Sequence, residues 1–129
     1  MTAVPVISII DDDASIRAGL NNLVRSLGYI AWTFASAEDF LTSTQLNDTW
    51  CVIADVRMPA MNGIQLQILL RDRGCRVPFI FITALPEEHS RRQALSDGAV
   101  CYLAKPFDES VLLSCLDTAV DHHLHGTIG

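Results

Sequence analysis

The chain has 129 residues, of which half are hydrophobic and 19% charged, and its formal net charge is −6 at pH 7. This length suits one domain with one core, and the hydrophobic content excludes a disordered chain. The nine basic residues are scattered, which argues against direct binding of nucleic acid. No apolar stretch approaches the roughly 20 residues that cross a bilayer, and no signal peptide is recognisable, so we expect a cytoplasmic protein without a membrane partner.

Five short apolar segments alternate with longer segments in which apolar residues recur at helical spacing. The short segments predict strands and the longer ones predict helices. In chain order, we expect strands at 4–10, 29–34, 52–55, 77–83 and 100–104. The helices are expected between 13 and 28, from 36 onward, and over 64–73, 87–97 and 108–122.

Polar residues and glycines mark the ends of these helices. Asp13 and Ser36 each precede a helical segment and are expected to cap it, Ser36 with an acidic residue three positions later as in a capping box. Glycine follows three of the helices, at Gly28, Gly74 and Gly98. The short connections imply parallel strands joined by right-handed crossovers. We therefore predict an α/β fold, a doubly wound three-layer sandwich in one unit.

The four cysteines show no pattern of a redox or metal site. They lie 24, 26 and 14 residues apart with no C-x-x-C pair, at Cys51, Cys75, Cys101 and Cys115. Because a core of this size needs no covalent crosslink, we expect four reduced thiols and no disulfide.

Reactive side chains follow four of the predicted strands. Asp11 and Asp12 end the first, Asp55 the third, Thr83 the fourth, and Lys105 the fifth. Parallel strands end at one edge of the sheet, which is where open α/β sheets bind ligands. The sequence therefore predicts a site with three carboxylates, a hydroxyl and an ammonium.

This combination suits a divalent metal and a phosphoryl group. Unit charges ~4 Å apart repel by ~4 kcal/mol at an effective dielectric constant of ~20, and bound Mg²⁺ removes that cost for carboxylates. Asp55 can act as a nucleophile and form an aspartyl phosphate. Lys105 can neutralise a phosphate oxygen, and the Thr83 hydroxyl can donate to another.

The chain resembles the receiver domain of bacterial response regulators, with the CheY-like (flavodoxin-like) fold, over about residues 4–122. The resemblance implies a five-stranded parallel sheet in the order 2-1-3-4-5, and a single receiver domain over 1–129 with no output domain in this chain. It rests on Ile10-Asp11-Asp12-Asp13, Asp55-Val56-Arg57-Met58-Pro59 with Gly63, Ile82-Thr83-Ala84, and Gly98-Ala99 leading to Tyr102-Leu103-Ala104-Lys105-Pro106-Phe107.

The resemblance implies a role for each residue of the predicted site. Asp55 would accept phosphate from a sensor histidine kinase. Asp12 would bind Mg²⁺ directly and Asp11 mainly through water, with Asp55 and the backbone carbonyl of Arg57 as the other protein ligands. Lys105 would bind the phosphate. Such a domain is not an enzyme in the ordinary sense, because it catalyses only its own phosphotransfer and autodephosphorylation.

The resemblance also implies a conformational switch. Thr83 would move toward the phosphate, and the ring of Tyr102 would turn into the vacated space. The Lys105–Pro106 peptide bond is expected to be cis. Leu85 stands where other receivers often carry a polar side chain that orients water, so we expect slow loss of phosphate, with Arg57 as a second residue that could shield the phosphoryl group.

The segments around 11–17 and 34–41 look most like the FixJ/NarL-type subgroup, whose members usually carry a downstream helix-turn-helix domain. This implies a role in transcription regulation. It also implies a phosphorylation-dependent homodimer through the face formed by the fourth helix, fifth strand and fifth helix.

Two alternative functions use the same fold. A haloacid-dehalogenase-like phosphatase would use Asp11 as nucleophile and Asp13 as acid/base, but it gives Asp55 no role, and only 24 residues follow Lys105. A pseudo-receiver would act without phosphorylation, although every phosphorylation residue is present. The histidines at His122, His123 and His125 resemble a metal cluster, but a solvated helix end is the simpler interpretation.

Overall fold

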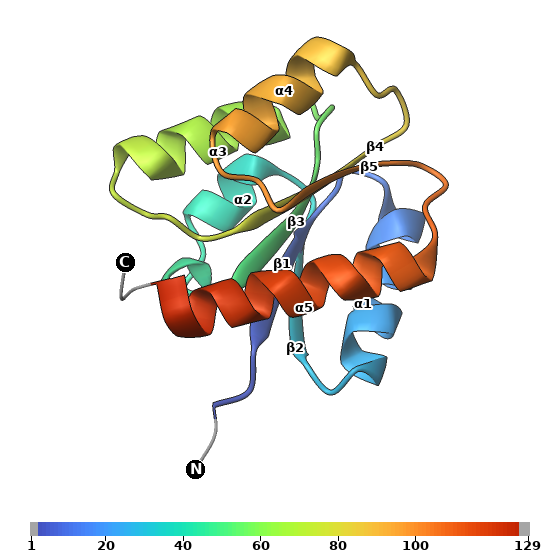
Figure 1. Ribbon diagram of the computed structural model, residues 1–129, viewed down its shortest axis with the longest axis vertical. Helices are drawn as coiled ribbons and strands as arrows, with labels where there is room; N and C mark the ends of the chain where they lie inside the picture. The colour runs from blue at the N-terminus through green and yellow to red at the C-terminus, as the bar shows by residue number, and fades with distance from the viewer. Residues whose placement is uncertain (1–2, 127–129) are drawn as a thin grey trace.

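The computed structural model describes residues 3–126, and their side chains through residue 123 (Figure 1). The described residues form one parallel sheet in the order β2-β1-β3-β4-β5, as the resemblance implies. The strands are β1 (Val6–Ile10), β2 (Ile30–Phe34), β3 (Cys51–Asp55), β4 (Phe79–Thr83) and β5 (Cys101–Ala104). The helices are α1 (Ala14–Ser26), α2 (Ala37–Leu41), α3 (Gly63–Asp72), α4 (Glu88–Ser96) and α5 (Glu109–Gly126), with a 3₁₀ turn, η1, at Leu46–Asp48.

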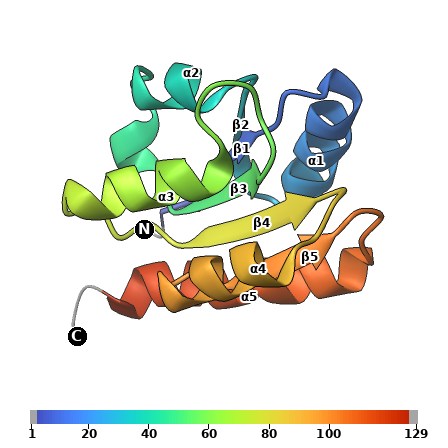
Figure 2. The ribbon, with the colours of Figure 1, turned by 90° about the horizontal axis from the view of Figure 1, so that it is seen from above.

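Helices cover both faces of this sheet, as predicted for a doubly wound fold. In Figure 2 the sheet lies between α3 on one side and α5 on the other. One buried cluster joins the sheet to α1 and α5, and a second joins it to α2, α3 and α4. The three central strands β1, β3 and β4 are buried along their whole length, whereas β2 and β5 at the edges are partly exposed.

The strand register brings the carboxyl ends of the strands to one edge. Asp55, the last residue of β3, pairs with Ile82, and Thr83, the last residue of β4, pairs with Ala104. Asp11 follows β1 directly, and its N–H donates to the carbonyl of Phe34 at the end of β2. The four strand ends that carry reactive residues are therefore level with one another.

Local hydrogen bonds explain where the helices begin. The Asp13 carboxylate accepts from the Ser15 N–H at 2.8 Å and caps α1, as predicted. The Ser36 hydroxyl accepts from the Asp39 N–H at 3.0 Å. A further capping box at α3, between Asn62 and Gln65, was not predicted, because the helix was expected to begin at residue 64, whereas it begins at Gly63.

Several element bounds differ from the predictions by a few residues. The strands β1 and β4 begin two residues later than expected, at Val6 and Phe79, each directly after a proline, which has no N–H to donate to the ladder. The helix α5 continues beyond residue 122 to Gly126. No helix among the described residues is long and apolar enough to span a membrane.

The prediction that all four cysteines are reduced is wrong. Cys101 in β5 and Cys115 in α5 form a disulfide, with their Cα atoms 6.3 Å apart, whereas Cys51 and Cys75 are free. The spacing of the cysteines along the chain could not reveal that α5 packs Cys115 against the sheet beside Cys101. Cys51 is fully buried, and burial raises the pKa of its thiol far above the usual range.

Candidate functional site

The edge formed by the carboxyl ends of the strands gathers the predicted acidic residues. Carboxylate oxygens of Asp11, Asp12 and Asp55 lie within 4.8 Å of one another. Asp11 and Asp55 are buried, whereas Asp12 is exposed. The cluster is therefore open to solvent on the side of Asp12 and closed on the side of the sheet.

Lys105 connects two of these carboxylates. Its ammonium Nζ donates to Asp11 Oδ2 at 3.0 Å and to Asp55 Oδ2 at 3.3 Å. The backbone N–H of Lys105 donates to the Thr83 carbonyl at 2.8 Å, which holds the start of the β5–α5 loop against the end of β4. The Lys105–Pro106 peptide bond is cis, as expected.

The charges at this site do not balance, because three carboxylates surround one ammonium. Burial raises the pKa of Asp55, and the charge of Asp11 raises it further, while the hydrogen bond from the Arg57 N–H and the charge of Lys105 act in the opposite direction. Burial alone would lower the pKa of Lys105, but its hydrogen bond to Asp11 and the charges of both carboxylates raise it. The ammonium is therefore retained, and negative charge remains in excess.

The donor set fits a hard divalent cation. Such cations prefer carboxylate oxygens, and Mg²⁺ is commonly bound by one or two carboxylates together with water and phosphate oxygens. Asp11, Asp12 and Asp55 form the group of acidic residues among the described part of the chain that could hold a metal ion. Positive charge at this position would also relieve the repulsion that raises the pKa of Asp55.

Gly63 holds the loop after Asp55 in place. A Cβ atom at this position would lie 2.5 Å from the Asp55 carbonyl oxygen and 3.0 Å from the Phe81 ring, so only glycine fits. Its N–H donates to the Val56 carbonyl at 3.0 Å, and the Arg57 N–H donates to Asp55 Oδ1 at 3.1 Å. The close packing of α3 against β3 thus helps to set the position of the Asp55 carboxylate.

Thr83 and Tyr102 lie on neighbouring strands, and their polar atoms contact the loop between β4 and α4. The Thr83 hydroxyl is fully buried and accepts from the Leu85 N–H at 3.2 Å. Tyr102 is half-buried, and its hydroxyl accepts from the Glu87 N–H at 3.4 Å. The Leu85 side chain, by contrast, is 58% exposed. Thr83 and Tyr102 thus contact the same loop, between β4 and α4.

An ion pair that sequence reasoning missed crosses this region. The Arg57 guanidinium contacts the carboxylate of Glu87, the residue that precedes α4. The two residues are 30 positions apart, and Glu87 lies at the start of the segment 87–97 that was expected to be helical. A basic residue two positions after Asp55 and an acidic residue four positions after Thr83 are the signal that could have suggested the pair.

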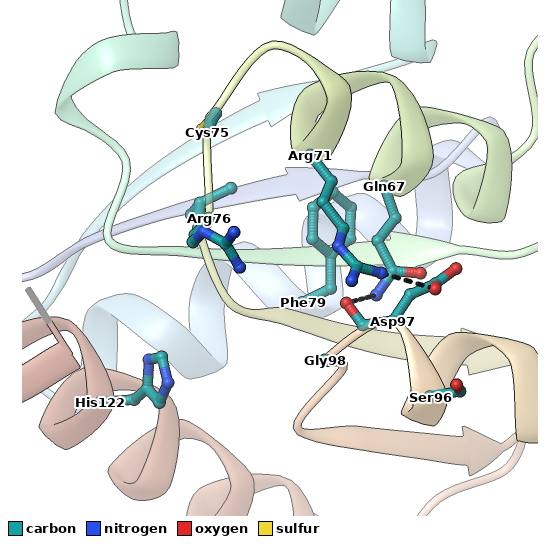
Figure 3. Close-up of a pocket in the computed structure, with 10 residues that line it drawn as sticks. Gln67, Arg71, Cys75, Arg76, Phe79, Ser96, Asp97, Gly98 and His122 are labelled. Atoms are coloured by element: carbon teal, nitrogen blue, oxygen red, sulfur yellow. Dashed lines mark hydrogen bonds and ion pairs between the residues drawn. The ribbon is translucent and has the colours of Figure 1, made fainter. Parts of the chain in front are cut away.

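A hollow at the opposite end of the sheet contains none of the predicted site residues (Figure 3). It has a volume of about 500 Å³ and lies near the carboxyl ends of α3 and α4. The Gln67 amide donates to the carbonyls of Ala94 and Asp97 at 3.1 and 3.4 Å, and Arg71 pairs with the Asp97 carboxylate at 2.7 Å. These contacts join α3 to α4 and account for the Gln67 Nε2, Arg71 and Asp97 groups of the lining.

Of the three histidines near the C-terminus, only His122 and His123 have described side chains, and neither belongs to a group of described residues that could hold a metal ion. His122 lines the hollow of Figure 3, and the ring of His123 stacks on Trp50 with 4.3 Å between centroids. The side chain of His125 lies outside the described residues.

The family model of the response regulator receiver domain matches residues 7–117. The chain belongs to this family. Over 115 residues it is 38% identical to the response regulator protein TodT of Pseudomonas putida, covering 89% of this chain and 51% of that protein. It is 33% identical over 120 residues to the transcriptional regulatory protein FixJ of Bradyrhizobium diazoefficiens, covering 93% of this chain and 58% of that protein.

The fold agrees with solved receiver structures. Residues of this chain superpose on the response regulator StyR with a TM-score of 0.89 and 36% identity, covering 97% of this chain and 63% of that one. The chain spans about half the length of the curated relatives it matches. The predicted resemblance to FixJ-type receivers is therefore confirmed, and the acidic cluster matches the metal site typical of receivers.

Membership of this family decides against the phosphatase interpretation. Receivers are signalling domains rather than conventional enzymes, as predicted. The residue that the phosphatase would use as acid/base, Asp13, is engaged as the N-cap of α1. Asp55, which has no role in the phosphatase, is one of the three residues of the acidic cluster.

Proposed function

We propose that this receiver accepts a phosphoryl group from a sensor histidine kinase on Asp55, with Mg²⁺ as cofactor. The observation that carries this proposal is the bridging position of Lys105 Nζ between Asp11 and Asp55, which sets a cation beside the proposed nucleophile. Asp11, Asp12, Asp55 and the Arg57 carbonyl are the proposed metal ligands. The excess of negative charge in the cluster supports the need for a metal.

The proposed step is an in-line transfer. An Asp55 carboxylate oxygen forms a bond to phosphorus, and the bond from phosphorus to the kinase histidine nitrogen breaks, with the electron pair returning to the imidazole. Mg²⁺ held by Asp11, Asp12 and Asp55 would supply positive charge beside the phosphoryl oxygens. Lys105 stabilises another phosphoryl oxygen, because its ammonium already lies 3.3 Å from Asp55 Oδ2.

The proposed response passes through Thr83 and Tyr102. The Thr83 hydroxyl would exchange its contact with the Leu85 N–H for a phosphoryl oxygen. Since Tyr102 contacts the same loop through Glu87, movement of the loop would free its ring to turn inward. The affected surface consists of α4, β5 and α5, which we propose as the dimer interface of the phosphorylated form.

We further propose that this domain regulates transcription through a helix-turn-helix output domain outside this chain. The support is the length of the relatives, of which this chain spans about half, together with the name of FixJ as a transcriptional regulatory protein. Phosphoryl transfer from an ATP-dependent kinase would take place in the cytoplasm. The domain itself is not proposed to bind DNA, because its basic residues are few and scattered.

The test is intact-mass spectrometry after incubation with acetyl phosphate, with Mg²⁺ or with EDTA. We expect one phosphoryl adduct in the parent with Mg²⁺ and none with EDTA or in Asp55→Asn. A parent that gains no adduct under any condition would indicate a pseudo-receiver and contradict the proposal.

A further inference from the structure

The Arg57–Glu87 ion pair links the loop after the proposed phosphoacceptor to the start of α4. Arg57 is tied to Asp55 by its own backbone, since its N–H donates to Asp55 Oδ1 at 3.1 Å. Glu87 is tied to Tyr102, since its N–H donates to the Tyr102 hydroxyl. The ion pair therefore closes a chain of contacts that runs from Asp55 to Tyr102.

The Arg57–Glu87 ion pair lies where Arg57 can exchange Glu87 for another partner. Its two side chains are 54% and 57% exposed, and exposed ion pairs are weak. A hollow of about 500 Å³ lined by both residues lies beside it and leaves room for the arginine side chain to move. By comparison, the contacts of Lys105 with Asp11 and Asp55 involve side chains that are at most 16% exposed, and these are not easily broken.

A phosphoryl group on Asp55 would compete with Glu87 for the guanidinium. A phosphoryl group on a side chain carries a charge of about −1.5 to −2 near pH 7, whereas the Glu87 carboxylate carries −1. Arginine binds phosphate oxygens with two parallel hydrogen bonds. A phosphoryl group is therefore at least as good a partner for the guanidinium as the solvent-exposed carboxylate of Glu87. The backbone N–H of Arg57 lies 3.1 Å from Asp55 Oδ1, so the arginine side chain starts beside the proposed phosphoryl site.

We propose that Glu87 is a positioning residue that holds Arg57 away from the phosphoryl group on Asp55 and so sets the lifetime of that group. This inference rests on the proposed phosphorylation of Asp55. When Arg57 moves to the phosphoryl oxygens, its side chain covers them against water, and hydrolysis slows. Glu87 competes for the same guanidinium, which keeps the oxygens uncovered for part of the time.

The proposal is tested by the rate of phosphate loss in a double-mutant cycle. The parent, Glu87→Gln, Arg57→Gln and the double variant are phosphorylated with acetyl phosphate and Mg²⁺ and desalted, and the adduct is followed by intact mass. Glu87→Gln should lengthen the lifetime about two- to fivefold, the range that an exposed ion pair supports. Arg57→Gln should shorten it, and in that background the Glu87 substitution should have no effect.

Glu88→Gln is the matched control. Glu88 is the next residue of the chain and pairs with Arg91 and Arg92 rather than Arg57. Its substitution removes the same charge from the start of α4 and should leave the lifetime unchanged. A purely structural role of Glu87 would instead lower the melting temperature and act equally in both Arg57 backgrounds.

The outcomes separate this inference from the proposed function. An adduct in the parent with an unchanged or shorter lifetime in Glu87→Gln would overturn the inference alone, as would equal effects of Glu87→Gln and Glu88→Gln. A parent that forms no adduct would overturn the proposed function and the inference together.

Discussion

Lys105, the only lysine of the sequence, is expected to contribute most to the stability of the metal-free site. The substitution Lys105→Met removes the ammonium and keeps an unbranched side chain of similar length. Asp11 and Asp55, which are 2% and 8% exposed, would then face each other without a cation. We expect a loss of unfolding free energy that the double variant with Asp55→Asn largely restores.

The magnitude follows from the two contacts of Nζ at 3.0 and 3.3 Å. Coulomb's law at an effective dielectric constant of ~20 gives ~5 kcal/mol for each contact, before the desolvation of the ammonium is subtracted. Removing one partner of a buried ion pair costs ~3 to 5 kcal/mol. Since the lysine side chain keeps 16% exposure, we expect a cost at the lower end of this range, ~3 kcal/mol.

The assay is urea unfolding at pH 7 in EDTA, followed by circular dichroism. Arg92→Met is the control, because Arg92 is 71% exposed and pairs only with Glu88, so its loss should change stability by less than ~1 kcal/mol. The loss of unfolding free energy in Lys105→Met should become smaller at low pH, where the carboxylates are protonated. A Lys105→Met protein as stable as the parent, or an equal deficit in the Asp55→Asn background, would refute the reasoning.

Three other predictions concern stability and the shape of the site. Burial raises the pKa of Asp55 above its usual range. The contribution of this group to the unfolding free energy should therefore fall as the pH rises from the ordinary pKa of aspartate through the raised pKa. Unfolding of Asp55→Asn, measured as a function of pH in EDTA, should lack this fall. Reduction of the Cys101–Cys115 disulfide, whose partners are 14 residues apart, should lower the unfolding free energy by ~3 kcal/mol in urea titrations with and without dithiothreitol. Gly63→Ala should cost ~1 to 3 kcal/mol and reduce phosphorylation of Asp55, measured by thermal unfolding and by adduct formation, because the added Cβ meets the Asp55 carbonyl.

Each of these predictions has a contrary result. An Asp55→Asn protein with the same pH profile as the parent would mean that burial does not perturb this carboxyl group. The variant Cys115→Ala should be insensitive to reductant, and a parent that is equally insensitive would contradict the disulfide. Gly63→Ala with unchanged stability and phosphorylation would show that α3 can shift without moving Asp55.

The sheet and the acidic edge were predictable because they follow from chain-local patterns. Five apolar segments with short connections allow little besides a parallel sheet, and a strand that ends in Asp55 carries its carboxylate to the same edge as Asp11. Asp13 was predictable as a cap for the same reason, since its hydrogen bond spans only two residues.

The features that sequence reasoning missed depend on tertiary packing. The Cys101–Cys115 disulfide requires that Cys115, on the buried face of α5, lies directly beside Cys101 of β5. The Arg57–Glu87 pair requires the path of two loops whose residues are 30 positions apart. Apolar periodicity constrains neither of these, because it fixes which face of an element is buried but not which side chain it meets there.

The most direct test of the central claim is to locate the phosphoryl group. The phosphorylated protein is reduced with borohydride, which converts an aspartyl phosphate to homoserine, and is then digested with trypsin and mapped by mass spectrometry. Cleavage after Arg17, Arg25 and Arg57 separates the peptide 1–17, which contains Asp11, from the peptide 26–57, which contains Asp55. We expect homoserine at Asp55 in the second peptide, and homoserine at Asp11 in the first would contradict phosphorylation of Asp55.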